Sequence, residues 1–141
     1  MGMNIDGIVS GVVIDHITAG KSMEIYRYLH LDHLECPVAV IKNVKSSHMG
    51  KKDIIKIDDA TFDIDVEALG YLDPGATVNI IRDGKIVEKK HLALPEKLVN
   101  VIRCKNPRCI TSVEPGIDQI FHLVNEKERL YGCAYCDTER K

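Results

Sequence analysis

Four cysteines near the carboxyl end of the chain have the spacing of a metal site. They form two pairs, Cys104 with Cys109 and Cys133 with Cys136, in the pattern C-x4-C, 23 intervening residues, C-x2-C. Two tight turns of this kind can present four thiolates to one Zn²⁺ at about 2.3 Å. In a reducing compartment, clustered cysteines are metal ligands more often than disulfides. We therefore predict a zinc site, with two disulfides or four unrelated thiols as the alternative.

The predicted metal is structural rather than catalytic. A catalytic zinc keeps one position open for water, whereas four sulfurs complete a tetrahedral shell. His122 could replace one cysteine, but it stands in the alternating run of residues 120–124, where we expect it on one face of a strand. Three nearby cations, Arg103, Lys105 and Arg108, can offset the thiolate charge. A segment of about 45 residues buries little core, so we expect it to fold poorly without its metal.

The composition is that of a soluble globular protein. The chain has 141 residues, of which 45% are apolar and 28% charged, with a net charge of −2. This length suits one domain or two small ones. No run approaches about 18 apolar residues and the first residues lack the pattern of a secretory signal, so we predict a cytoplasmic protein without a membrane span. The weak net charge does not favour a nucleic-acid partner.

The stretch before the cysteines has the alternating elements of an α+β domain. Strands are expected where β-branched and apolar residues cluster, and helices where apolar residues recur every three or four positions. Asp83 and Gly84 between two such strands are a strong hairpin signal, and Ser22 is a candidate N-cap. A basic loop is expected over residues 42–52. The expected strands are residues 8–14, 38–41, 53–57, 78–81 and 85–87, and the expected helices are residues 22–33 and 63–72.

This order, strand–helix–strand–strand–helix–strand with one added hairpin strand, is the split βαβ pattern of ferredoxin-like folds. We predict a ferredoxin-like α+β domain over residues 1–95, followed by a small zinc-ribbon-like antiparallel β domain over residues 96–141. The boundary rests on Pro95 and on the cysteines. Charge does not mark it, because 11 basic and 14 acidic residues give −3 before it, and 8 and 7 give +1 after it.

Polar residues on the predicted strands could bind a phosphorylated ligand. Lys56 alternates with apolar neighbours, so it should stand on one face of the sheet. Lys89 and Lys90 are expected at the end of the last strand, and Asp15 and His16 at the end of the first. If the strands are neighbours, Lys56 and Lys89 could converge on a triphosphate. The alternative for each lysine is a solvated strand edge.

Along nearly its whole length the chain resembles the regulatory subunit of aspartate carbamoyltransferase. The order and spacing of several blocks carry the likeness: residues 13–17 (VIDHI), 49–57 (MGKKDIIKI), 76–79 (ATVN), 94–96 (LPE), 100–101 (NV) and the four-cysteine framework. The resemblance implies a non-catalytic chain in pyrimidine biosynthesis whose amino-terminal domain binds ATP or CTP, with UTP beside CTP. It also implies homodimers through that domain and a zinc domain that contacts the catalytic chains. Nucleotide binding would then shift the enzyme between two quaternary states.

Carried over position by position, the resemblance also implies a nucleotide site. The implied contacts of the ribose are Asp15 and Lys56, and those of the phosphates are Lys89, His16 and Lys52. The implied contacts of the base are the side chains of Ile8, Val13 and Ile81 and the backbone groups of Asp6, Gly7, Ile81 and Ile86. Two positions depart from the family pattern. Gly84 replaces a bulkier residue in the hairpin, which leaves the discrimination between ATP and CTP open, and Thr18 replaces a proline.

Two other classes of function are weighed against this one. Zinc ribbons that bind nucleic acid need a basic patch with interleaved aromatic residues, and residues 96–141 contain only Phe121, Tyr131 and Tyr135 as aromatics. A small metabolite enzyme on the same scaffold would need turnover by the isolated chain, and no nucleophile elbow, P-loop or dinucleotide glycine motif occurs. His30 and His33, three positions apart on a predicted helix, are interpreted as surface residues.

Overall fold

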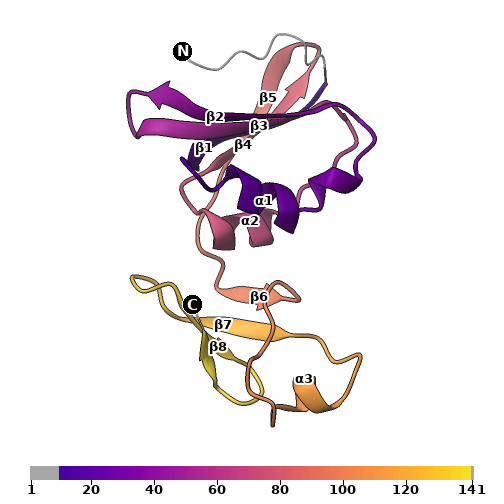
Figure 1. The fold of residues 1–141 in the computed structure, drawn as a ribbon, viewed down its shortest axis with the longest axis vertical. Coiled ribbons are helices and arrows are strands. Elements are labelled where there is room, and N and C mark those ends of the chain that lie inside the picture. Colours follow the sequence, from indigo (N-terminus) through magenta and orange to yellow (C-terminus); the bar gives the residue numbers. More distant parts are fainter. Residues whose placement is uncertain (1–9, 141) are drawn as a thin grey trace. The chain divides into compact units, whose positions relative to one another are not determined.

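The computed structural model describes residues 10–140, and the chain divides into two units, Met1–Ala93 and Leu94–Lys141 (Figure 1). Each unit has its own sheet, and the helices of the described residues have at most seven residues. The α+β class predicted from the sequence is confirmed. Over residues 10–140, no helix is long and apolar enough to span a membrane.

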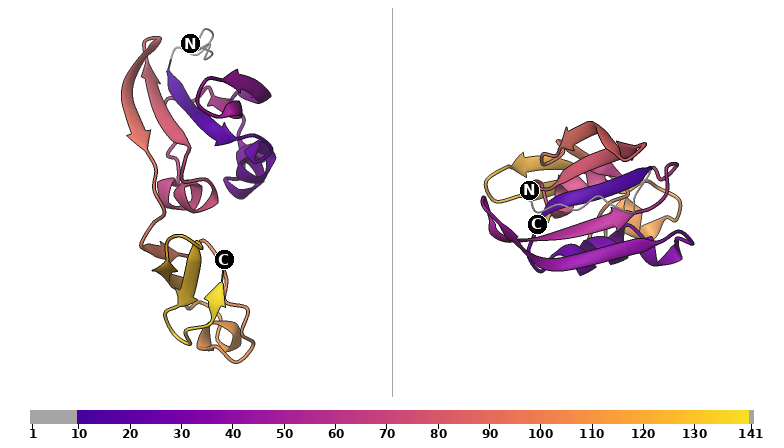
Figure 2. Two further views of the ribbon diagram at one scale, coloured as in Figure 1. Left: turned by 90° about the vertical axis from the view of Figure 1, so that its left-hand side faces the viewer. Right: turned by 90° about the horizontal axis from the view of Figure 1, so that it is seen from above.

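The first unit is a five-stranded sheet with helices on one face. The strands run in the order β2-β3-β1-β4-β5, and every neighbouring pair is antiparallel. Because β1 lies between β3 and β4, each βα connection skips one strand, which is the split βαβ arrangement. Figures 1 and 2 show the helices on the same side of the sheet. The elements are β1 (Gly11–Thr18), α1 (Ser22–Tyr28), η1 (Leu31–His33), β2 (Val38–Ser46), β3 (Gly50–Ile57), α2 (Val66–Leu72), β4 (Thr77–Arg82) and β5 (Lys85–His91).

The two faces of this sheet are packed differently. The face toward the helices contributes to the large apolar core, which includes Ile25 of α1 and Leu69 of α2. Side chains alternate between the faces along a strand, so the intervening residues lie on the opposite face. There, Val13, Ile54 and Ile81 form a smaller buried cluster. The face without helices is therefore partly apolar, and polar side chains stand around that cluster.

The hairpin between β2 and β3 is longer than predicted. The prediction of a basic loop over residues 42–52 is wrong, because β2 continues to Ser46 and β3 begins at Gly50. Pairing of Val44 with Lys52 and of Ser46 with Gly50 extends both strands. Cross-strand pairing thus overrides the polar composition of the segment, as is common for strands.

The first helix is shorter than predicted. The expected helix over residues 22–33 divides into α1 and the 3₁₀ turn η1, because His30 between them takes a left-handed φ of 55°. The prediction of Ser22 as N-cap is also wrong. Lys21 occupies the cap position and makes no side-chain hydrogen bond there.

The polar residues expected at two strand ends have different outcomes. Lys89 and Lys90 lie at the end of β5, as predicted, with only His91 after them. β1, by contrast, continues past Asp15 and His16, across a bulge in which His16 has a φ of 56°. A bulge lets a strand resume its pairing after one irregular residue, which local periodicity does not reveal.

The predicted hairpin turn has the expected structure, whereas the helix expected over residues 63–72 begins only at Val66. Asp83 and Gly84 form the turn between β4 and β5 with φ values of 52° and 75°, the two positive angles that a type I′ turn requires. α2 begins one residue after Asp65, whose side chain accepts a hydrogen bond from the backbone N–H of Ala68 at 3.1 Å. This is the N-cap contact expected of an aspartate.

The second unit is a small four-stranded antiparallel sheet in the order β6-β7-β8-β9. Its buried apolar residues are few and include Leu98, Phe121 and Tyr131. The Tyr131 hydroxyl donates a hydrogen bond to the Pro95 carbonyl at 2.6 Å, which ties the start of this unit to its sheet. The elements are β6 (Lys97–Val99), α3 (Ile110–Val113), β7 (Ile120–Asn125), β8 (Leu130–Cys133) and β9 (Glu139–Arg140).

Candidate functional site

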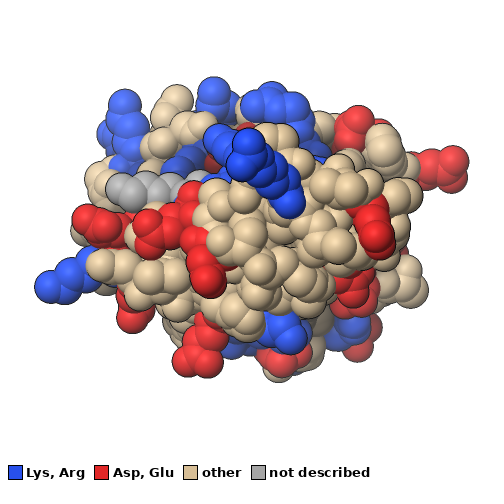
Figure 3. All heavy atoms as spheres, turned by 90° about the horizontal axis from the view of Figure 1, so that it is seen from below, with Lys and Arg blue, Asp and Glu red and all other residues tan. Residues whose placement is uncertain are grey.

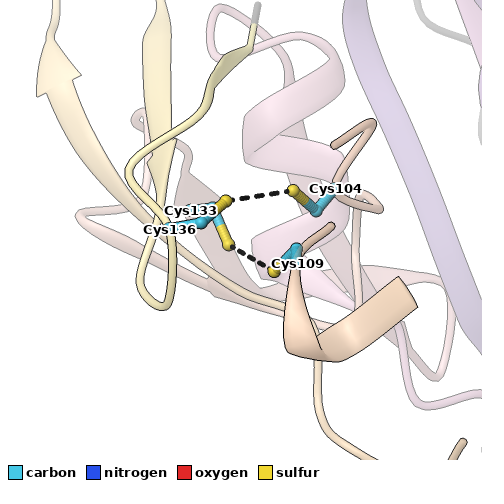
Figure 4. Close-up of side chains that lie close together, drawn as sticks. All are labelled: Cys104, Cys109, Cys133 and Cys136. Atoms are coloured by element: carbon cyan, nitrogen blue, oxygen red, sulfur yellow. Dashed lines mark hydrogen bonds between the residues drawn. The ribbon is translucent and has the colours of Figure 1, made fainter. Parts of the chain in front are cut away.

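The four predicted cysteine ligands come together in the second unit. The loop after β6 carries Cys104 and Cys109, and the end of β8 with the turn after it carries Cys133 and Cys136; all four sulfur atoms lie within 4.8 Å of one another (Figure 4). The Sγ atoms of Cys104 and Cys136 are 3.6 Å apart, and those of Cys109 and Cys133 are 3.7 Å apart. Four sulfurs at 2.3 Å from a tetrahedral ion lie about 3.8 Å apart. The geometry therefore fits one ion held by four thiolates.

The first cysteine pair is shaped by Asn106. Its carbonyl accepts hydrogen bonds from the backbone N–H of Cys109 at 3.1 Å and from the hydroxyl of Ser112 at 2.8 Å. Its side-chain oxygen accepts from the N–H of Arg108 at 3.0 Å. An Asn side chain that bonds its own backbone two residues on makes a tight turn. Asn106 and the following Pro107 thus bring the two cysteines onto one knuckle.

The second pair has a tighter turn. The N–H of Cys133 donates to the carbonyl of Thr138 at 3.0 Å, and the N–H of Asp137 donates to the carbonyl of Cys133 at 2.9 Å. Asp137 takes a φ of 62°, a left-handed conformation that Asp tolerates better than most residues. These bonds turn the chain back at Cys136, so that its sulfur faces that of Cys104.

Burial and hydroxyl contacts act on the thiols in opposite directions. Burial raises the pKa of Cys104 to about 12 and also raises the pKa of Cys133. Hydrogen bonding to Thr138 lowers the pKa of Cys136 to about 6, and hydrogen bonding from Thr111 lowers the pKa of Cys109. Four thiolates at these distances repel one another strongly, so all four become ionised together only around a cation.

The other predicted contributors to the metal site are exposed. His122 stands exposed on β7, where it pairs with Lys97 and Gly132, and it is not among the clustered ligands of the described residues. Arg103, Lys105 and Arg108 are all exposed. Figure 3 shows basic side chains grouped mainly in the upper part of the view and acidic side chains mostly at its sides and lower edge, around an uncharged area.

The predicted nucleotide residues gather on the sheet face without helices. Strand register aligns Lys56 with Val13, Val13 with Asn79, and Asn79 with Lys89. Directly paired residues point to the same face of a sheet, so this row crosses four strands on one face. For both lysines to bind one triphosphate, Lys56 and Lys89 would have to lie on neighbouring strands. They do not, because β1 and β4 separate β3 from β5. Three strand spacings put their backbones about 14 Å apart, so the two lysines would contact different parts of one ligand.

A second group of charges stands beside this row. The ammonium of Lys52 pairs with the carboxylate of Asp15 at 3.0 Å, and both side chains are buried. His16 Nδ1 lies 3.0 Å from the hydroxyl of Thr77. Burial lowers the pKa of His16, as do the charges of Lys52 and Lys89, while Asp15 opposes them. The ammonium groups of Lys52 on β3 and Lys89 on β5 thus lie near the imidazole of His16 on β1 at this corner of the sheet.

The apolar part of the predicted site is adjacent to the same row. Val13 and Ile81 are buried together on this face, and Ile86 pairs with Ile81 and is half exposed. Gly84, at the hairpin turn, has no atom within 4 Å of the position of an added Cβ. The three remaining predicted residues, Asp6, Gly7 and Ile8, lie outside the described residues.

Sequence reasoning missed Asn79, the third member of the row. Its side chain is 3% exposed, and within residues 10–140 its amide oxygen has no hydrogen-bond partner. A buried polar oxygen without a partner is unfavourable unless a ligand or water completes it. The sequence feature that could have revealed this residue is an Asn between apolar residues in a predicted strand, because Asn is uncommon in strands.

Two buried carboxylates support the strands that carry these residues. Asp53, fully buried, accepts hydrogen bonds from the backbone N–H groups of Gly20 at 3.1 Å, Ser22 at 3.3 Å and Asn43 at 2.9 Å. Asp73 accepts from the backbone N–H and the hydroxyl of Thr18, at 2.7 and 3.1 Å. They hold the end of β1 and the loop to α1 in place. Neither was predicted, because their partners lie 31–55 residues away or on another strand.

These features define a class of protein: a small two-unit chain in which a sheet face lined with cations accompanies a closed four-thiolate metal centre. Sequence comparison identifies the class further. The family described as aspartate carbamoyltransferase regulatory chain, allosteric domain, matches residues 3–93, and the metal binding domain of the same chain matches residues 96–141. The chain belongs to the aspartate carbamoyltransferase regulatory chain family, as the resemblance in the sequence predicted.

Relatives cover nearly the whole chain. The aspartate carbamoyltransferase regulatory chain of Clostridium tetani is 52% identical over 135 residues, which are 96% of this chain and 94% of that one. The regulatory chain of Bifidobacterium longum is 49% identical over 139 residues, 99% of both chains. The chain is therefore a non-catalytic regulatory chain with an allosteric and a metal-binding domain. The second domain is a metal-binding domain, and it contains the four-cysteine cluster, whose sulfurs are spaced as one metal ion would require.

Proposed function

We propose that this chain binds CTP, ATP and UTP on the sheet face without helices, and that binding biases the catalytic chains between two quaternary states. The observation that carries this proposal is the row of Lys56, Val13, Asn79 and Lys89 across four strands of one face. A nucleotide has a charged end and an aromatic end joined by a polar sugar. The face offers cations for the charged end, apolar side chains for the aromatic end and buried polar groups for the sugar.

The phosphates would bind at the corner where Lys89, Lys52 and His16 gather. Charge-assisted hydrogen bonds from cations to phosphate oxygens are the strongest of their kind. Lys52 is held by Asp15 at 3.0 Å, so its ammonium is oriented before a ligand arrives. Asn79, whose buried oxygen has no partner in the described part of the chain, can accept from a ligand hydroxyl.

The ribose and base would lie further along the row. We assign Asp15 and Lys56 to the ribose, and the buried Val13 and Ile81 with Ile86 to the base, together with Asp6, Gly7 and Ile8. Apolar residues with a few polar groups at fixed positions are typical of small-molecule sites. Open space around Gly84 supports a base pocket that is wider than is usual in the family, and therefore a weaker preference between CTP and ATP.

We further propose that the metal is Zn²⁺, one per chain, bound by Cys104, Cys109, Cys133 and Cys136. The sulfur separations of 3.6 and 3.7 Å support a tetrahedral thiolate site. With four protein ligands the ion has no open position and stabilises the fold. The allosteric role is assigned to residues 1–95 and the metal-dependent role to residues 96–141.

The assembly follows from these assignments. The metal domain would contact the catalytic chains, in keeping with its exposed apolar residues Ile110, Val113 and Val124. The nucleotide domain would form a homodimer, and the edge strands β2 and β5 offer unpaired backbone groups for this. A nucleotide shifts the enzyme only by its difference in affinity for the two quaternary states. Couplings of this kind are about 1–3 kcal/mol and are reciprocal for binding.

Calorimetric titration of the full zinc-loaded chain with CTP and with ATP tests the nucleotide site. Lys89→Ala should weaken binding by about tenfold or more, because a hydrogen bond to a charged group contributes about 1.5–3 kcal/mol. Lys90→Ala is the matched control. Lys90 is the next residue and pairs with the core residue Val78, so its side chain lies on the other face and the variant should bind like the wild type.

Two outcomes would count against the proposal. If neither nucleotide binds to the folded, zinc-loaded chain, the proposed nucleotide site is ruled out. Equal losses in Lys89→Ala and Lys90→Ala would place the ligand off this face. Co-purification with catalytic chains, measured separately, tests the assembly without depending on either result.

A further inference from the structure

A second group of metal-binding side chains lies far along the chain from the cysteines. His30, Asp32 and His33 occupy the turn between α1 and β2, and their ligand atoms all lie within 4.8 Å of one another. Over residues 10–140, these three and the four cysteines are the groups of at least three such side chains with this spacing. All three side chains are exposed. They belong neither to the metal domain nor to the proposed nucleotide face.

The backbone of this turn fixes the two histidines on the same side. The N–H of His33 donates to the carbonyl of His30 at 3.1 Å, which closes a 3₁₀ turn. His30 precedes this 3₁₀ helix with a left-handed φ of 55°. The two imidazole rings stack across the turn, with centroids 5.4 Å apart and planes inclined by 21°. Leu31 between them is 1% exposed and anchors the turn in the core.

The carboxylate completes a three-sided arrangement. Asp32 Oδ2 lies 3.7 Å from Nε2 of His33. Two ligand atoms on one ion at 2.0–2.2 Å are separated by about 3.3 Å in tetrahedral geometry and by about 4.2 Å when opposite each other. Exposed side chains can close the remaining gap by rotation, since the backbone already holds them on one side.

We propose that His30, Asp32 and His33 form a second, open metal site that takes a divalent transition-metal cation such as Zn²⁺. Two imidazoles and one carboxylate favour transition-metal ions such as Zn²⁺ and Ni²⁺ over Mg²⁺ or Ca²⁺, which prefer oxygen ligands alone. Three protein ligands leave positions for water. This site therefore differs from the closed cysteine centre, and it links the end of α1 to the segment that leads into β2.

The test uses the full chain with its cysteine centre loaded and excess metal removed. Calorimetric titration with ZnCl₂ should show one further equivalent per chain, and titration with MgCl₂ should show none. His33→Ala should weaken this second binding event by at least about tenfold, because even the outer-shell partners of a metal ligand contribute 10- to 100-fold. His30→Ala should do the same, and Asp32→Asn should weaken binding less.

Two control variants separate this site from other metal ligands. His91→Ala removes an exposed histidine of β5, and Cys36→Ser removes the free thiol nearest in sequence to the turn. Both should leave the second equivalent unchanged. Imidazole C–H resonances of His30 and His33 should shift in the wild type as the second equivalent is added, which reports the site directly.

Three results would overturn the proposal. One is a second equivalent that survives in both His30→Ala and His33→Ala. Another is the loss of that equivalent in Cys36→Ser or His91→Ala. The third is binding of Mg²⁺ with the affinity of Zn²⁺, which would mark a nonspecific acidic surface. All three variants of the site change exposed side chains. The melting temperature of each variant, measured before the second metal equivalent is added, should therefore equal that of the wild type.

Discussion

The two units of this chain are stabilised in different ways. In the first, a dozen buried apolar residues pack between the five-stranded sheet and its helices, and the buried carboxylates of Asp53 and Asp73 join loops to strands. In the second, a handful of buried apolar residues covers a four-stranded sheet, and four sulfurs converge where the chain has least core. A unit of this size needs a metal where a larger one relies on apolar packing.

The largest expected difference between the units is their response to loss of the metal. Chelation should unfold residues 96–141, because structural zinc contributes about 10 kcal/mol to small domains. The strands β1–β5 should stay folded, since their core contains no metal ligand of the cysteine cluster. Amide spectra recorded before and after chelation measure both units at once. Persistence of dispersed β7 and β8 signals in the metal-free chain would show that the small core suffices alone.

Removal of a buried carboxylate should destabilise the first unit and leave the second unit unchanged. Asp53→Ala leaves three backbone N–H groups of the first unit without their acceptor, and should destabilise that unit by about 3 kcal/mol or more. Asp59→Ala is the matched control, because the Asp59 carboxylate accepts its hydrogen bonds from the neighbouring Thr61 and the residue is only half-buried. Denaturant unfolding followed at residues of each unit should show a lower midpoint for β1–β5 only. Equal midpoints for Asp53→Ala and Asp59→Ala would contradict this role.

Acid should act on the first unit through the same group. Burial by itself raises the pKa of Asp53, but hydrogen bonds from Ser22, Asn43 and Gly20 outweigh it, so the pKa lies below its ordinary value. The unfolded chain, with an Asp pKa of about 3.9, then binds the proton more readily than the folded one. The stabilisation is therefore present above about pH 4 and is lost as the pH falls through the folded pKa. Unfolding of Asp53→Asn across this range should show a weaker pH dependence than the wild type.

His16 should give nucleotide binding a pH dependence. Burial lowers the pKa of His16, and Lys52 and Lys89 lower it further, so the imidazole is neutral at pH 7 without a ligand. Phosphate favours the protonated ring, so the affinity for CTP should rise as the pH falls from 8 to 6, by up to about tenfold. His16→Gln should abolish this slope. An unchanged slope in that variant would assign the effect to the phosphate itself.

Substitution of one glycine in each unit should give the smallest difference in stability between the units. Gly84→Ala meets no neighbour but must hold a φ of 75°, so backbone strain of about 1–2 kcal/mol is expected. Gly132→Ala places a Cβ 3.2 Å from a methyl group of Val124, which that exposed side chain can relieve by a small shift. Thermal unfolding of each unit should therefore change more for Gly84→Ala. The opposite order would mean that β7 and β8 are packed too tightly to yield.

Much of this architecture could be read from local patterns. The spacing of the cysteines, the turn at Asp83 and Gly84 and the order of the elements were all predictable, because each depends on residues close together in the sequence. The predictions were wrong where strand pairing or one residue of irregular backbone conformation decides the outcome. The long β2–β3 hairpin, the break of the first helix at His30 and the passage of β1 through a bulge at His16 are such cases.

The sequence by itself determined which chemistry is present: thiolates at knuckle spacing, cations and apolar residues on alternating strands, and the family to which the chain belongs. The tertiary structure decided which of these residues share a face. The row from Lys56 to Lys89 exists because β1 and β4 lie between β3 and β5 in one register. The three donors to Asp53 meet because a buried charge must have partners, wherever in the chain they arise. Register and burial are set by contacts between distant segments, so they are fixed only when the whole sheet is assembled.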